Sequence, residues 1–234
     1  MKNFKLNRLS QAIRIGVMAS LAFVTGAQAV EKVGAPRAVY RATCYEAIPE
    51  HKELVQSIQI QIAELKAKGR LADAEWLHQR MMGHMREKWD VSQSNLVTTA
   101  GLTDILDKYF KGSSYTAAWF CGLVSSVSFS AYNAADTMSS HSGWLEAGGT
   151  NAPTYTGNRP ALTFGTASAG SLATSSASSF TFTGAGTVKG MFATTVTTKD
   201  GTTGVLYNAV NFTGGDRIVA NTDVVNVSVT FTAT

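Results

Sequence analysis

The most restrictive feature of this sequence is a strict alternation of apolar and polar residues near its C-terminus. Val225, Val227, Val229 and Phe231 alternate there with Asn226, Ser228, Thr230 and Thr232. A period of two places one row of side chains in a core and the other row in water, as in a strand of a half-buried sheet. The C-terminal part of the chain is therefore expected to belong to a β-rich domain.

Strand-like patterns continue upstream, separated by residues that favour turns. The predicted strands span 115–124, 126–131, 159–165, 178–184, 187–197, 203–211 and 224–233, with a weaker one at 39–45. Glycine and asparagine or aspartate recur between them, residues that tolerate positive φ. The segment 148–158 is predicted to be a polar loop, and the serine-rich tract 168–179 a long loop or an edge strand. We expect a mainly β protein with α appendages, its strands forming a β-sandwich, of which the jelly roll is one type.

A helical pattern interrupts this β sequence at 49–89. Pro49 suits a first helical turn, Leu54, Val55, Ile58, Ile62 and Leu65 recur at helical spacing, and Gly69 is placed to end the helix. A second apolar stripe follows, made of Leu71, Ala74, Leu77, Met81 and Met85. The short link predicts an inserted antiparallel helical hairpin, too small to be stable alone.

The hairpin is also the predicted contact surface between copies of the chain. Ile60 lies off the main stripe and has no obvious partner within the hairpin. The candidate interface residues are Leu54, Ile58, Ile60, Ile62, Met81 and Met85. A homo-oligomer is therefore expected.

A third helix is predicted at 100–111. Leu102, Ile105, Leu106, Tyr109 and Phe110 fall on one helical stripe. Thr98 and Thr99 are candidate N-caps, and Gly112 is placed to end the helix. We expect this helix to plug one end or face of the β domain.

The N-terminal segment, Met1 to Ala29, has two interpretations. Basic residues precede an apolar stretch at 15–25, and Ala27-Gln28-Ala29 has the small-x-small pattern of a secretory cleavage site. The alternative is an amphipathic helix, which would be the chain's only contact with a membrane if uncleaved. The predicted organisation is therefore 1–29 signal-like or amphipathic, 30–48 first strand and linker, 49–89 helical hairpin, and 90–234 β domain.

Charge and cysteine content exclude some functions and leave others open. Residues 1–90 hold 14 Lys and Arg against 9 Asp and Glu, whereas residues 91–234 hold 6 against 7. The β region is thus nearly neutral, and no nucleic-acid partner is expected. Cys44 and Cys121 are the two cysteines, and they either form one disulfide or are two buried free thiols.

The search for catalytic or metal-binding residues finds no convincing set. Asp136, His141 and nearby serines are the residue types of a hydrolase triad, but no G-x-S-x-G motif accompanies them. Glu146 is interpreted as a hydrogen-bond anchor at a strand end. His78 and His84 are six residues apart, so they face different sides of a helix and do not suit a two-histidine metal site. We predict no enzyme activity, no cofactor and no metal.

Five aromatic residues are interpreted as core, with a sugar-stacking surface as the alternative: Trp119, Phe120, Phe129, Tyr132 and Trp144.

Several segments resemble a family of small, mostly uncharacterised proteins encoded by tailed bacteriophages and prophages. They are NLVTTAGL, DKYFKGSSYTAAW, ADTMSSHSGWLEA, GTVKGMFATTVTTKDGTTGVLY and FTGGDRIVANTDVVNVSVT, covering Asn95 to Thr234, with a shorter match at Ala38 to Tyr45. In similar sequences only a few residues bridge the positions of Cys44 and Trp89, whereas a long helical pattern intervenes here. The resemblance implies a virion structural role and transfers no catalytic residues.

We therefore predict a non-enzymatic virion protein. The favoured role is that of a capsid decoration or head-stabilising protein, whose partners are capsid or other virion proteins. One alternative is a tail-fibre or receptor-binding component. The other is an exported bacterial module that binds glycans or mediates adhesion, periplasmic or secreted if Met1–Ala29 is a cleaved signal.

Overall fold

The computed structural model describes residues 37–112, 114 and 118–232. The predicted N-terminal segment 1–29 and the first residues of the predicted strand 115–124 lie outside the described residues. The described part is mainly β, with two sheets and three α-helices, which confirms the β-rich fold with helical appendages. None of its helices combines the length and the apolar character needed to cross a membrane.

The first sheet contains the strand whose alternation was the strongest signal in the sequence. Its order is β2 (Met85–Ser94), β1 (Arg37–Ala47), β12 (Val224–Thr232) and β7 (Ser171–Ala173), and β8 (Ser178–Thr181) also pairs with β12. All pairings are antiparallel. Val225, Val227 and Val229 of β12 are buried, as the period of two predicts, whereas Ser228 is exposed.

The second sheet carries seven strands. Its order is β3 (Leu96–Val97), β10 (Leu206–Asn211), β9 (Gly186–Thr194), β4 (Phe120–Ser125), β5 (Glu146–Gly148) and β6 (Asn151–Thr154), and β11 (Arg217–Val219) also pairs with β9. The β5–β6 pairing is parallel and the others are antiparallel.

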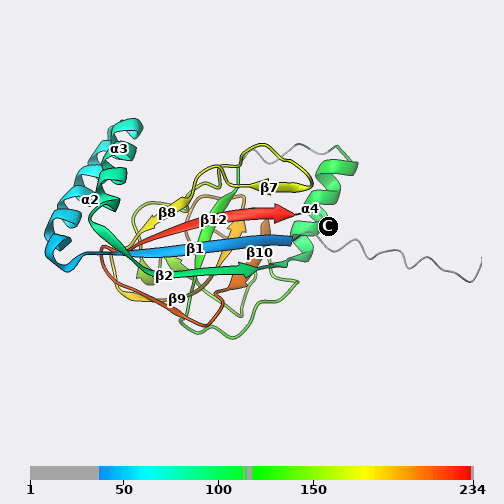
Figure 1. The fold of residues 1–234 in the computed structure, drawn as a ribbon. Coiled ribbons are helices and arrows are strands. Elements are labelled where there is room, and N and C mark those ends of the chain that lie inside the picture. The colour runs from blue at the N-terminus through cyan, green and yellow to red at the C-terminus, as the bar shows by residue number, and fades with distance from the viewer. Residues whose placement is uncertain (1–36, 113, 115–117, 233–234) are drawn as a thin grey trace, which may run out of the picture. The chain divides into compact units, whose positions relative to one another are not determined.

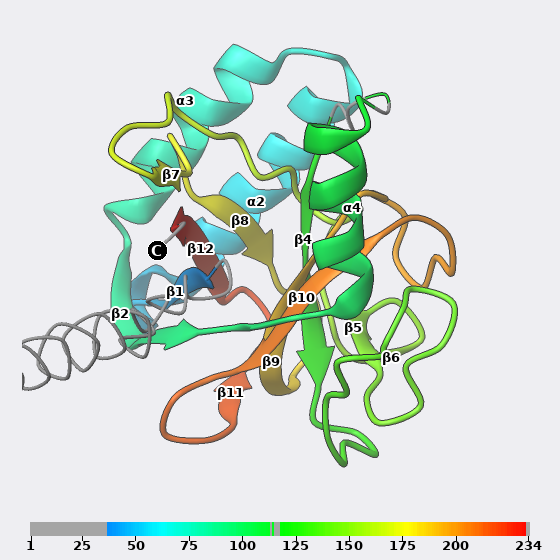
Figure 2. The same cartoon turned by 90° about the vertical axis from the view of Figure 1, so that its right-hand side faces the viewer.

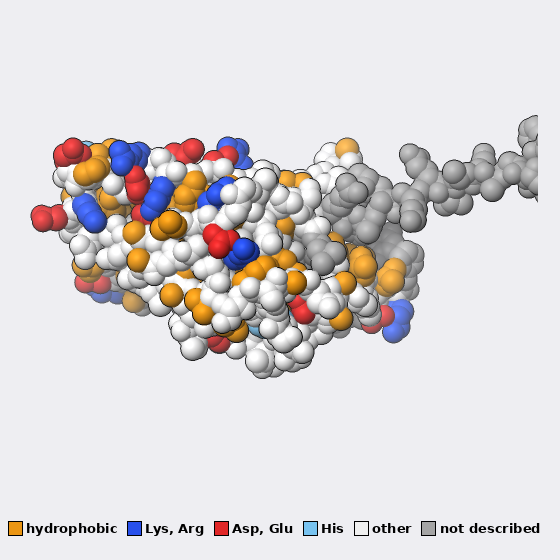
Figure 3. All heavy atoms as spheres, turned by 90° about the horizontal axis from the view of Figure 1, so that it is seen from below, with side chains coloured by type: hydrophobic (Ala, Val, Ile, Leu, Met, Phe, Trp, Pro, Cys, Tyr) orange, Lys and Arg blue, Asp and Glu red, His pale blue; other side chains and the backbone are white. Residues whose placement is uncertain are grey.

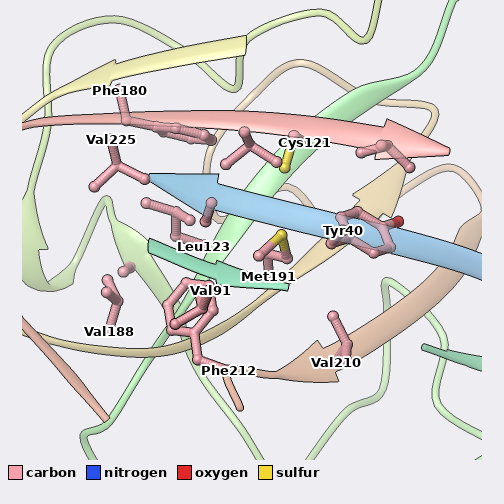
Figure 4. Packing of buried hydrophobic residues seen from close by; sticks show 14 of the residues in the cluster. Tyr40, Val91, Cys121, Leu123, Phe180, Val188, Met191, Val210, Phe212 and Val225 are labelled. Atoms are coloured by element: carbon pink, nitrogen blue, oxygen red, sulfur yellow. The ribbon is translucent and has the colours of Figure 1, made fainter. Parts of the chain in front are cut away.

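Both sheets contribute to one large apolar cluster, which we call the central core. Figure 4 shows Tyr40 of β1 and Val225 of β12 among Leu123, Met191 and Val210, which come from the second sheet. The buried Tyr40 hydroxyl donates a hydrogen bond to Oδ1 of Asn208 on β10, so one polar contact also joins the sheets.

The inserted helices follow directly from the end of β1. A short 3-10 turn, η1 (Pro49–His51), leads into α2 (Lys52–Ala67), and Gly69 at φ +72° links it to α3 (Leu71–Met82). We call η1, α2 and α3 the helix pair. It lies at one end of β1 and β2, whereas α4 (Thr99–Phe110) lies at the other end (Figure 1).

One predicted helix boundary and two predicted strands are wrong. The helical segment 49–89 ends at Met82, because Met85 begins a strand that pairs along the length of β1. Residues 126–131 form no strand, since the ladder between β4 and β9 shifts register at Ser125 and the chain then turns away. Residues 159–165 contribute only the isolated bridges of Ala161 and Phe164.

One further strand lies where a loop was predicted, and another lies in the tract that was predicted as a loop or an edge strand. The polar loop 148–158 contains β6, whose start is held by the side-chain amide of Asn151 donating to the backbone oxygen of Glu146 (3.1 Å). The serine-rich tract contains β7, which agrees with the edge-strand alternative.

The five aromatic residues do not behave alike. Trp144 is fully buried. Trp119 packs on the central core, where its ring meets that of Tyr207 edge to face, with the ring centres 5.5 Å apart. Phe129 and Tyr132 pack beside Trp144 in a smaller cluster, and Phe120 is half-buried. The core interpretation therefore describes Trp144 fully and the other four in part.

Candidate binding surface around the inserted helices

The helix pair buries most of the residues predicted to form an interface. Val55, Ile58 and Ile62 of α2 pack with Ala74 and Met81 of α3. Met85 and Val224, from the first sheet, complete this helix-pair cluster. Ile58, Ile62, Met81 and Met85 are therefore unavailable to a partner, and their assignment to an interface is wrong because the two helices and the sheet end already cover them.

Other apolar side chains of the helix pair remain exposed. Leu54 and Ile60, from the predicted interface, lie in this group with Leu71 and Trp76. Trp76 is 60% exposed, and the guanidinium of Arg80 lies 5.0 Å from the centre of its ring. An exposed tryptophan held by a cation stack is the kind of side chain that anchors protein contacts.

Charge distribution also distinguishes this end of the protein. In Figure 3, blue and red side chains gather at the left-hand end of the visible face, where the helix pair lies, whereas most of the remaining described surface is uncharged. Residues 37–90 hold 9 Lys and Arg and 8 Asp and Glu, so this part of the chain is rich in charge of both signs without a large excess of either.

A hollow of about 450 Å³ lies between α2 and the β region. Its helical wall is one face of α2, formed by Gln56, Gln59, Ile60, Ala63 and Lys66. Its opposite wall comes from three separate segments and includes Thr156, Asn158, Ser179, Thr181 and Asn221. Amide and hydroxyl groups therefore occur on both walls, but most of the lining surface is apolar, since Ile62, Pro160 and Phe182 also contribute to it.

Two polar side chains, one on each wall of this hollow, differ in their hydrogen bonding. The Gln59 side-chain amide donates to the backbone oxygen of Thr222 at 2.9 Å, which fastens α2 to the β region. The Ser179 hydroxyl is buried and has no hydrogen-bond partner among the described residues. A buried unpaired hydroxyl beside a hollow is a ready contact for a ligand's polar group.

The α4 helix meets the β region through its first turn. Thr98 caps the helix by accepting from the Gly101 N–H (3.1 Å), as predicted. A Cβ built on Gly101 would lie 2.5 Å from the backbone oxygen of Tyr207, so glycine permits the close approach to β10 that Figure 2 shows.

The predicted packing stripe of α4 is covered only in part. Ile105 packs on the central core and Leu102 is half-buried, but Leu106 is 56% exposed. The side chains of Tyr109 and Phe110 lie outside the described part of the chain. The expectation that all five residues face a partner surface is wrong at Leu106, because the glycine contact fixes how the helix is turned.

Cys44 and Cys121 are both free and buried, one in each sheet. The disulfide alternative is therefore not what the structure contains. Burial raises the pKa of both thiols, and Asp223 raises that of Cys44 further. Both residues pack as small apolar side chains.

Asp136 and His141, two residues of the triad type considered above, both contact the side chain or backbone of Trp144. The Trp144 indole N–H donates to Oδ2 of Asp136 at 2.9 Å. His141 stacks on the indole ring at 4.0 Å, and its Nδ1 lies 3.0 Å from the Trp144 backbone oxygen. The two residues therefore order the loop before β5.

Glu146 is at a strand end as predicted, but its partner was missed. Its two carboxylate oxygens accept from Nε and Nη2 of Arg159 at 2.7 and 2.6 Å, and both side chains are buried. The Asp200 N–H also donates to this carboxylate, and Nη1 of Arg159 donates to the Val196 oxygen. This buried ion pair joins the start of β5 to two loops, and an arginine in a nearly uncharged region was the available signal.

The two histidines weighed as a metal pair do not meet. His78 is half-buried on α3, where burial lowers its pKa, and it lines a smaller hollow. His84 instead faces His51. In the described part of the chain, no three His, Cys, Asp or Glu side chains are placed to hold a metal ion.

Comparison with protein-family models and with curated proteins found no match for this chain.

Proposed function

We propose that this protein is a non-enzymatic structural component of a tailed-phage or prophage particle, and that it binds a lattice of capsid proteins through the helix pair. The observation that carries the proposal is the set of exposed apolar side chains on an insertion at the end of two long strands (Figure 1). Leu71 and Trp76 belong to this set. The insertion that carries them extends beyond the end of the first sheet (Figure 1). The resemblance in the sequence supports a virion as the setting.

The β region would serve as the body that carries this contact. We propose that its two sheets pack as a β-sandwich, and the supporting observation is that both contribute to the central core. Their nearly neutral outer surface suits docking on a protein shell, where a strong charge of one sign would be repelled by copies on neighbouring positions.

Substitution of the exposed anchor tests the lattice contact. We expect Trp76→Ser to lower occupancy on purified particles about thirtyfold, since truncating a binding hot spot costs about 2 kcal/mol or more. The matched control is Ile218→Ser, because Ile218 is 68% exposed but lies on β11 of the second sheet. Equal occupancy of the wild type and Trp76→Ser would contradict binding through the helix pair.

The position of the protein in the particle distinguishes the proposed capsid role from the tail alternative. Particles dissociated into heads and tails should carry the protein in the head fraction, as counted by quantitative mass spectrometry. Recovery in the tail fraction would instead favour the tail-fibre or receptor-binding alternative, which shares the particle but not the capsid lattice.

The hollow beside α2 favours a second candidate, the exported glycan-binding module. Its walls combine apolar side chains with amide and hydroxyl groups, and this mixture suits a sugar, which presents both apolar ring faces and hydroxyl groups. Binding of soluble oligosaccharides, lost in Asn158→Ala and kept in a control such as Asn211→Ala on β10, would support it. Intact mass decides between settings: a periplasmic chain starting at Val30 favours export, and a full-length chain in particles favours the virion.

A further inference from the structure

Two histidines far apart in sequence meet at the base of the helix pair. His51 is the last residue of η1, and His84 lies between the end of α3 and the start of β2. The chain leaves and re-enters the first sheet at neighbouring points, where the Ile48 N–H donates to the His84 backbone oxygen at 3.1 Å. The pairing of β1 with β2 therefore brings the two imidazole rings together.

The rings present the same nitrogen to each other. Their Nδ1 atoms are 3.3 Å apart, the ring centres are 4.8 Å apart and the ring planes are inclined by 86°. Both residues are partly buried. A direct hydrogen bond needs one Nδ1 to carry a proton and the other to lack it. If neither carries one, two lone pairs are directed into the same small space.

The nitrogen spacing fits a shared metal ion. Zinc binds imidazole nitrogen at about 2.0–2.1 Å in tetrahedral geometry, which places two ligand nitrogens about 3.3–3.4 Å apart. The Nδ1–Nδ1 distance of 3.3 Å falls in this range. It is longer than the roughly 2.9–3.0 Å that is commonest for hydrogen bonds donated by N–H groups.

We propose that His51 and His84 bind one first-row transition-metal ion through their Nδ1 atoms, with water or a donor from outside the pair completing the coordination. Imidazole ligands suit zinc, copper and nickel, and leave magnesium unbound. Because the two ligands stand at the two ends of the helix pair, the ion closes the insertion into a clipped loop. Such a clip stabilises the helix pair by restricting its less folded states.

Zinc titration of the full chain tests this site. The wild type is expected to bind one Zn²⁺ per chain by calorimetry, and Mg²⁺ is expected to give no heat. His51→Asn and His84→Asn should each weaken zinc binding by at least about tenfold, because each removes one of two protein ligands. The matched control is His78→Gln, which removes a histidine from the same helix pair but not from the site.

A second measurement covers variants that fold poorly. In the wild type, Zn²⁺ should slow amide hydrogen exchange in α2 and α3 and leave the exchange of β9 and β10 unchanged. Zinc should also protect His51 and His84, but not His141, from chemical modification of their imidazole rings. Protection of this pattern supports the site without any substitution.

Three results would overturn the proposal. One is a wild type that binds no zinc at millimolar concentration, which would leave the pair as a plain hydrogen bond. Another is zinc affinity that falls as much in His78→Gln as in His84→Asn. The last is zinc binding that leaves amide exchange in the helix pair unchanged, because an ion at its base must restrain both of its ends.

Discussion

The helix pair and the β region are stabilised in different ways. The β region has a central core to which both sheets contribute, and a buried ion pair and a buried tryptophan fasten its loops. The helix pair has a small cluster of its own, completed by Met85 and Val224 from the first sheet. The insertion therefore draws part of its small core from the first sheet.

The largest expected effect comes from the ion pair of the β region. Arg159→Met leaves the Glu146 carboxylate buried without its partner, and we expect the free energy of unfolding to fall by about 3–5 kcal/mol. Denaturant unfolding followed by near-UV circular dichroism of Trp144 measures it. Arg41→Met is the control, because the Arg41–Asp90 pair is exposed and worth about 1 kcal/mol or less. Similar losses in both variants would contradict this assignment.

A cavity in the helix pair should destabilise that region more than the β region. Met81→Ala removes a fully buried side chain, and such a truncation costs about 2–5 kcal/mol. We expect faster amide exchange in α2 and α3 with little change in β9 and β10, because partial unfolding of the insertion spares the central core. Leu71→Ala, at an exposed position, is the control. A uniform increase over the whole chain would show that the two regions unfold as one.

A smaller loss is expected at the first turn of α4. Gly101→Ala places a methyl group against the backbone of Tyr207, which cannot move aside cheaply, and we expect a cost of about 1–3 kcal/mol. The change should appear in unfolding of the β region and should leave the helix pair's exchange rates unchanged. A neutral result would mean that α4 can shift along β10 without cost.

The smallest effect is a dependence on pH confined to the helix pair. Burial lowers the pKa of His78 below its ordinary value near 6.5, so the folded chain binds fewer protons there than the unfolded chain. The free energy of unfolding therefore falls as the pH drops through that ordinary value towards the lower folded one. His78→Gln should remove this part of the loss, measured as the difference from the wild type at about pH 7.5 and about pH 5. An unchanged difference would contradict the burial of this imidazole.

The sequence predicted the β-rich fold and the three helices because their patterns are regular. The alternation in β12 and the glycines after α2 and α4 are local signals that do not depend on distant residues. β2 was missed for the opposite reason. Met85 follows Met81 at helical spacing, and the bulge opposite Cys44 and Tyr45 disturbs the alternation of the strand.

The candidate surface was harder to predict than the fold. Leu54 and Ile60 were predicted to lie in an interface and are exposed. The same prediction included four residues that are buried in the helix-pair cluster, namely Ile58, Ile62, Met81 and Met85. The hollow combines one helix face with segments about a hundred or more residues away, and no local pattern reports such an arrangement. The Arg159–Glu146 pair and the His51–His84 contact were missed because both depend on how the chain folds back on itself.

The place where the helices enter the sheet has a consequence for how this protein can vary. β1 and β2 are adjacent and antiparallel, so the chain leaves and returns within one backbone hydrogen bond, from Ile48 to His84. Any segment whose ends lie that close can occupy the same position without altering the register of the sheet, whether a tight turn of a few residues or a folded unit. One insertion can therefore be replaced by another at this junction, in evolution or by design, while the two sheets keep their pairing.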